Sequence, residues 1–144
     1  MAGAEKLYTP ELLALAVTLA DYPPDGALPL HGDARSKSCG STLRADLAVD
    51  DEGRIERIGL QVRACAVGQA AAAVFARAAA GQGVEQIGAA HASLTAWLAG
   101  SGGPPAWPGI EAIAPARDFP ARHGAIMLPW TAALDALSSA APSG

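Results

Sequence analysis

The chain has 144 residues, the size of one ordinary domain, and carries a net charge of −4 with 10 Lys plus Arg. This balance gives no electrostatic reason to expect binding to nucleic acid or to a membrane surface. The start has no basic segment leading into an apolar one, and no apolar run reaches the ~20 residues that a membrane span needs. We therefore expect a cytoplasmic protein without nucleic-acid or membrane partners, whose thiols stay reduced.

Composition also constrains the core and the cysteine chemistry. Hydrophobic residues make up 51% of the chain but aromatic residues only 5%, so much of the core must be built from small side chains. The two cysteines, Cys39 and Cys65, are too few for a disulfide-stapled secreted scaffold. Their role becomes the central question that the sequence raises.

The first part of the chain predicts one helix followed by a long loop. Thr9 is a hydroxyl N-cap, Pro10 suits the first helical position, and leucines then recur at helical spacing. The helix should stop at Tyr22, which two prolines follow. Residues 23–42 are rich in Pro, Gly, Ser and charge, and predict a loop that contains one short strand near residues 35–38.

A β-hairpin is predicted over residues 43–62. Apolar and polar side chains alternate in residues 43–49 and again in residues 56–62, which is typical of strands with one buried face. The sequence Asp-Asp-Glu-Gly at residues 50–53 has the chemistry of a turn.

Helical patterns dominate the rest of the chain. An alanine-rich helix is predicted over residues 67–80, with Gly81 as its C-terminal cap, and a second helix over residues 84–98. A short segment around residues 110–114 precedes a last helix from about residue 119 to 137. Pro129 should kink that helix unless it lies in the first turn.

Together these elements predict an α+β fold. We expect a small antiparallel three-stranded sheet with helices packed on one face, one helix before the sheet and the others after it. Residues 1–138 should form a single domain, and residues 139–144 a disordered tail.

Several catalytic and nucleotide-binding motifs are absent from the sequence. It contains no G-x-S-x-G elbow, no G-x-x-x-x-G-K-[ST] loop and no H-E-x-x-H pair, and its three histidines share no metal-binding spacing. No acid–base pair or activated nucleophile with an orienting partner is evident. We therefore expect a protein that is not an enzyme.

The predicted hairpin brings Cys39 and Cys65 to the same end of the sheet. Cys39 directly precedes the first hairpin strand, and Cys65 follows the second strand where the alanine-rich helix begins. A helix N-terminus favours negative charge, and two thiolates at one sheet end are suited to a soft metal. The alternative is that both are structural thiols, because a buried free cysteine usually behaves as a small hydrophobic side chain.

The order of elements and several short segments resemble the iron–sulfur cluster assembly scaffold family, the U-type or NifU N-terminal-like proteins. The resemblance spans about residues 7–137 and includes the family's acidic hairpin turn and its two cysteine blocks. The matching segments are Leu7-Tyr8-Thr9-Pro10-Glu11, Ser38-Cys39-Gly40, Val49-Asp50-Asp51-Glu52-Gly53-Arg54-Ile55, Ala64-Cys65, and Phe119-Pro120-Ala121-Arg122 with Leu128-Pro129-Trp130.

The resemblance implies a scaffold or carrier that binds iron or an iron–sulfur cluster, or accepts sulfur, through Cys39 and Cys65. Its partner would be a cysteine desulfurase or another cluster-assembly protein. A homodimer would supply four thiolates, the usual shell of a two-iron cluster. Two family positions differ here: the aspartate of Cys-Gly-Asp is Ser41, and the third cysteine falls on Ala125.

Three further side chains are candidate replacements for the missing ligands. His123 precedes Ala125 by two residues, which along a helix turns it by roughly 200° away. His31 and Asp33 lie upstream in the glycine-containing loop. Two alternative functions therefore stay open: a degenerate binding or regulatory module that has lost metal binding, and a Cys2His zinc site formed with His123.

Overall fold

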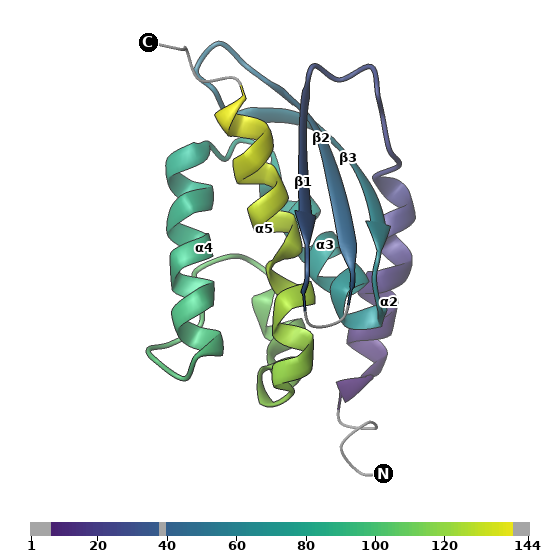
Figure 1. Cartoon of the computed structure of the whole chain (residues 1–144), viewed down its shortest axis with the longest axis vertical. Helices are drawn as coiled ribbons and strands as arrows, with labels where there is room; N and C mark the ends of the chain where they lie inside the picture. The colour runs from purple at the N-terminus through teal and green to yellow at the C-terminus, as the bar shows by residue number, and fades with distance from the viewer. Residues whose placement is uncertain (1–6, 38–39, 140–144) are drawn as a thin grey trace.

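The structure is a computed structural model that describes residues 7–37 and 40–139. Three strands follow an N-terminal helix and precede the remaining helices (Figure 1). Cys39, the first six residues and positions 140–144 of the expected tail lie outside the described residues. In chain order the elements are α2 (Pro10–Thr18), 3₁₀ helix η1 (Leu19–Asp21), β1 (Leu30–Arg35), β2 (Thr42–Val49), β3 (Ile55–Arg63), α3 (Ala66–Ala79), α4 (Val84–Leu98), η2 (Ile110–Asp118), η3 (Pro120–Arg122) and α5 (His123–Ser138).

The sheet has the order β1-β2-β3, and both strand pairs are antiparallel. The predicted hairpin is confirmed: Leu43 pairs with Val62 and Leu47 with Ile58. A register shift lies at the end of β2, next to the acidic turn. The three-stranded α+β architecture expected from the sequence is therefore present.

The third strand was predicted at the wrong place. Residues 35–38 were expected to be extended, but β1 spans Leu30–Arg35 and its centre is Gly32. A side chain on Gly32 would overlap the backbone of Ala132 and Ala136 in α5. Glycine is therefore required by the close approach of the helix to the strand, although in the sequence it is typical of a loop.

The helices lie on one face of the sheet. α5 packs on β1 and β2, and α3 packs on β3, while α2 and α4 cover α3 and α5 from outside (Figure 1). Alternate residues of β2 point to these helices, and all three, Leu43, Ala45 and Leu47, are buried. No helix within residues 7–37 and 40–139 is both long and apolar enough to cross a membrane.

Small side chains allow these layers to lie close together, as the composition predicts. Six of the 14 residues of α3 are buried alanines, and alanine combines high helix propensity with little volume. Three of the seven aromatic residues form one cluster, where Phe75 stacks on Trp107 at 5.2 Å and Trp130 meets both rings edge-on. The Trp107 Nε1–H also donates a hydrogen bond to the Val74 carbonyl at 3.0 Å.

The helix ends follow the predicted signals except near residue 120. The Thr9 hydroxyl accepts a hydrogen bond from the Leu12 N–H at 3.1 Å, and Gly81 has a φ of +84° after α3. The last helix starts later than expected, because a separate 3₁₀ turn precedes His123. Pro129 lies inside α5, where it has no N–H to donate to the carbonyl four residues earlier.

We predict that Gly32→Ala lowers the free energy of unfolding by about 1–3 kcal/mol or more, because the added methyl group overpacks the contact between β1 and α5. Urea unfolding monitored by circular dichroism measures this change. The matched control is Gly88→Ala in α4, where an added methyl meets no atom within 4 Å. The control should be stabilised by about 0.5–1 kcal/mol, and equal effects of the two substitutions would contradict the packing argument.

Candidate functional site

The residues that flank the two cysteines meet at one end of the sheet. The Ser36 N–H donates to the Ser41 carbonyl at 2.8 Å, so the turn between β1 and β2 is tight. Thr42, the first residue of β2, pairs with Arg63, the last residue of β3, and Cys65 follows two positions later. Figure 1 shows the end of β1, the start of β2 and the start of α3 at the same lower end of the molecule.

Cys65 lies at the junction between β3 and α3. It is the N-cap residue of α3, with extended backbone angles, and its carbonyl accepts a hydrogen bond from the Gln69 N–H at 2.9 Å. Its side chain makes no capping hydrogen bond and forms no disulfide, and the residue is half-buried. The Gln69 side chain donates to the Ala64 carbonyl at 2.9 Å, which fixes the residue just before the thiol. Hydrogen bonds therefore fix the backbone on both sides of the thiol, while the thiol itself makes no capping hydrogen bond.

Ala125 lies one helical turn from this junction. A Cβ added at Gly68, in the first turn of α3, would lie 3.2 Å from the Ala125 Cβ. Ala125 is fully buried in the first turn of α5. The position that aligns with the family's third cysteine is thus packed against the turn that Cys65 begins. Ser41, which aligns with the family's aspartate, is also buried and lies in the turn that precedes β2.

His123 is engaged elsewhere. Its Nε2 lies 2.7 Å from the Arg117 carbonyl oxygen, which can only accept, so Nε2 carries the proton and donates. Only Nδ1 is left for a metal in this arrangement, and the role of His123 as a ligand stays a prediction. Within the described ranges, no three His, Cys, Asp or Glu side chains are grouped so that they could hold a metal ion.

His31 and Asp33 lie in β1 rather than in a loop. The Nδ1 of His31 is 2.6 Å from Oδ1 of Asp46, its direct neighbour on β2. His31 is four residues from Arg35, where β1 ends, which is about 13 Å along an extended strand. The Asp33 N–H donates to the Asp135 carboxylate at 3.0 Å. The His31 side chain is therefore engaged by Asp46, and the backbone of Asp33 is tied to α5.

Asp46 is a buried carboxylate that sequence reasoning missed. Alternation places it on the polar face of β2, but the segment of residues 22–25 crosses that face and covers it. Its two oxygens accept hydrogen bonds from the Asp25 N–H at 3.0 Å, from the His31 Nδ1–H and from the Arg44 Nε at 3.1 Å. The apolar neighbours of Asp46 gave no signal of this, because the covering loop is distant in sequence.

The ionised form of Asp46 stabilises the fold. Burial removes water and raises the pKa of Asp46, but the hydrogen bonds from His31 and Asp25 and the charge of Arg44 outweigh burial, so its pKa lies below the ordinary 3.8. A carboxyl group with a lowered folded-state pKa contributes stability above its unfolded-state value. This contribution is lost as the pH falls through the folded-state pKa.

We predict that Asp46→Asn lowers the free energy of unfolding at pH 7 by about 1–3 kcal/mol, because the amide cannot satisfy all three donors. Urea unfolding at pH 7 and at pH 3 measures the effect, which should shrink at the lower pH as the wild-type carboxylate takes up a proton. The matched control is Asp51→Asn in the exposed β2–β3 turn, which should leave stability unchanged. Equal stability of Asp46→Asn and wild type at pH 7 would refute the anchoring role.

Comparison with solved structures identifies the fold. No protein-family model matches the chain, and no curated protein matches it either. The structure is similar to that of the N-terminal part of a nitrogen-fixing NifU-like protein from Brucella abortus, with a TM-score of 0.85 and 27% identity, covering 94% of this chain and 95% of that one.

Two more distant likenesses show the fold alone. A candidate iron–sulfur cluster assembly scaffold protein for the SUF system from Fervidobacterium islandicum AW-1 has a TM-score of 0.79 at 16% identity, covering 91% of this chain and 96% of that one. A hypothetical protein has a TM-score of 0.65 at 20% identity, covering 88% and 96%. The fold and the order of the elements agree with those of these solved structures, and the chain is similar to the N-terminal part of a NifU-like protein and to an iron–sulfur cluster assembly scaffold.

Proposed function

We propose that the protein is a scaffold or carrier that holds iron or an iron–sulfur cluster, or accepts sulfur, on Cys39 and Cys65. The observation that carries the proposal is the likeness to a NifU-like N-terminal structure over 94% of the chain. The strand register supports it, because Arg35 at the end of β1 and Thr42 at the start of β2 lie in register with Arg63, which comes two residues before Cys65. The cluster is the cargo of such a protein rather than a catalyst, so the protein acts as a carrier and not as an enzyme.

The number of thiols sets the stoichiometry. Two cysteines per chain supply half of the four thiolates that a two-iron cluster usually has, so two copies of the chain would share one cluster. As a sulfur acceptor, one thiolate would attack the terminal sulfur of a persulfide on a cysteine desulfurase. The S–S bond of that persulfide breaks, and the desulfurase leaves as a thiolate. Both reactions need reduced thiols and hence a reducing compartment such as the cytoplasm.

The packing of Ala125 favours a second candidate, a binding or regulatory module that keeps the fold but does not bind metal. The buried methyl of Ala125 fills the space against Gly68 where a third thiol would stand. Such a module would still dock on a desulfurase or another cluster-assembly protein. A zinc site formed by the two cysteines and His123 is a third candidate, which would require the Nδ1 atom of His123.

Anaerobic reconstitution with iron and sulfide tests the first candidate. We expect visible charge-transfer bands, about one two-iron cluster per dimer by iron and acid-labile sulfide analysis, and dimer formation upon loading. Cys65→Ser should abolish the bands, and Cys39→Ser should do the same. Loading that is unaffected by Cys65→Ser, or no loading of the wild type, would contradict cluster binding.

Partner binding distinguishes the second candidate. If the protein is a metal-free module, the double variant Cys39→Ser/Cys65→Ser should bind a cysteine desulfurase as tightly as wild type does, measured by calorimetry.

For the zinc candidate, His123→Ala should lower the zinc content of the purified protein, and a chelator should lower the melting temperature of wild type.

Restoring the third cysteine gives a further prediction. Ala125→Cys should tighten binding of Co²⁺, used as a probe, by more than about tenfold and strengthen thiolate-to-cobalt absorption, since losing even an outer-shell partner of a metal ligand costs at least that much. Ala133→Cys, also fully buried in α5 but two turns further along, is the matched control and should change neither. An equal response of the two variants would show that Ala125 does not lie at the metal site.

A further inference from the structure

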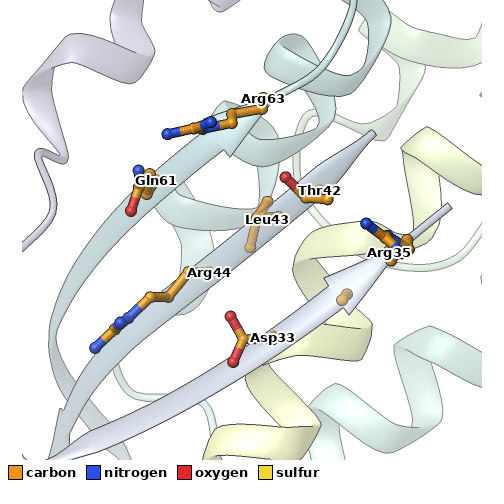
Figure 2. A pocket seen from close by; sticks show the side chains of 8 residues that line it. Asp33, Arg35, Thr42, Leu43, Arg44, Gln61 and Arg63 are labelled. Atoms are coloured by element: carbon orange, nitrogen blue, oxygen red, sulfur yellow. The ribbon is translucent and has the colours of Figure 1, made fainter. Parts of the chain in front are cut away.

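The sheet face opposite the helices carries a group of arginines at the end where the cysteine blocks meet. Arg35, Thr42 and Arg63 form one cross-strand row, and the row beside it contains Arg44 and Gln61. These residues line a hollow of about 530 Å³, with Asp33 at its rim (Figure 2). We call it the arginine hollow. Its basic character is local, because the whole chain carries a net charge of −4.

Two of the three arginines make no ion pair within the described residues. Arg44 is tied to Asp46 through its Nε at 3.1 Å. Arg35 and Arg63 are exposed, and neither forms an ion pair with another residue in the part of the chain that the structure describes. Unpaired guanidinium groups that flank a polar hollow are suited to carboxylates, which they bind with two parallel hydrogen bonds.

The arrangement of the guanidinium groups indicates the shape of the ligand. Figure 2 shows Arg35, Arg44 and Arg63 on three neighbouring strands with their head groups standing apart, so they do not converge on one small anion. β1 and β3 lie on opposite sides of β2, two strand spacings or about 10 Å apart. In the extended polyproline II conformation, which has three residues per turn, carboxylates three residues apart lie on the same side of the chain and are separated by about 9 Å.

We propose that the arginine hollow docks an acidic, extended segment of a partner protein, with carboxylates three residues apart on Arg35 and Arg63. Arg63 precedes Cys65 by two residues, so the docked segment would lie beside the thiol. The identity of the partner, a protein that delivers sulfur or iron, rests on the proposed function; the docking itself does not. The segment of residues 22–25, which crosses the sheet at Gly59, closes the other end of the face.

Binding of a fluorescent peptide tests the proposal. The probe has three glutamates, each separated by Gly-Ser, and the reference peptide has glutamine at the same three places. At low salt we expect fluorescence anisotropy to show binding of the glutamate peptide and not of the glutamine peptide. The affinity for the glutamate peptide should fall as salt is added. Arg35→Gln and Arg63→Gln should each weaken binding about two- to fivefold, the strength of exposed ion pairs, and together by their product.

Two substitutions complete the test. Asp33→Asn removes the carboxylate at the rim and should tighten binding. Arg77→Gln, an exposed arginine on α3 away from the hollow, is the matched control and should leave binding unchanged. Unaltered binding by the Arg35/Arg63 double variant, or equal binding of the two peptides, overturns the proposal.

Other occupants of the hollow give distinct results. Inorganic sulfate and the unlabelled glutamate peptide are compared as competitors at matched ionic strength. If sulfate competes as strongly as the peptide, the hollow binds a compact anion, and the proposal of an extended ligand is overturned. Sedimentation measures self-association of the protein. If wild type self-associates in a salt-sensitive way and the Arg35/Arg63 double variant does not, the hollow binds a second copy of the chain instead. Peptide binding by the Cys39→Ser/Cys65→Ser variant separates this proposal from cluster binding: docking should survive there even if no cluster forms.

Discussion

The direct packing of α5 against the backbone of β1 is the contact on which the rest of the structure depends. Gly32 has no side chain, so Ala132 and Ala136 approach the strand itself. This places the first turn of α5 against α3, where Ala125 meets Gly68. A larger residue at either glycine would separate the layers and move the start of α5 away from Cys65. Small side chains therefore determine where the cysteine junction lies.

The two faces of the sheet have different roles. The inner face buries Leu43, Ala45 and Leu47 under the helices and supplies much of the hydrophobic stabilisation. The outer face is polar, and Asp46 ties β1, β2 and the segment of residues 22–25 together through charged hydrogen bonds. Because this segment covers only part of the outer face, the arginine hollow next to the cysteine end stays open.

The sequence predicted those parts of the fold that depend on local periodicity. Alternation over residues 43–62 gave the hairpin, and hence which ends of its strands meet. Helical spacing and capping residues gave α2, α3 and α4 closely. β1 was placed too late, because Gly32 and its charged neighbours are typical of a loop until the position of α5 is known.

The site was predicted less completely for the same reason. Antiparallel pairing was enough to bring the flanks of Cys39 towards Cys65, and the family resemblance singled out Ala125, which the structure places at the same junction. The burial of Asp46 and the grouping of the arginines depend on contacts between distant segments. No pattern within a single strand contains that information.

The aromatic cluster has a spectroscopic consequence. Trp107 and Trp130 lie with Phe75 where η2 and α5 pack on α3, and Trp130 Nε1 is buried without a hydrogen-bond partner in the described structure. Two of the three tryptophans of the chain therefore emit from one apolar environment, which is formed by the same pair of helices that meet at Ala125. The protein contains its own fluorescent reporter of the α3–α5 contact, so loosening of this junction can be followed without a label.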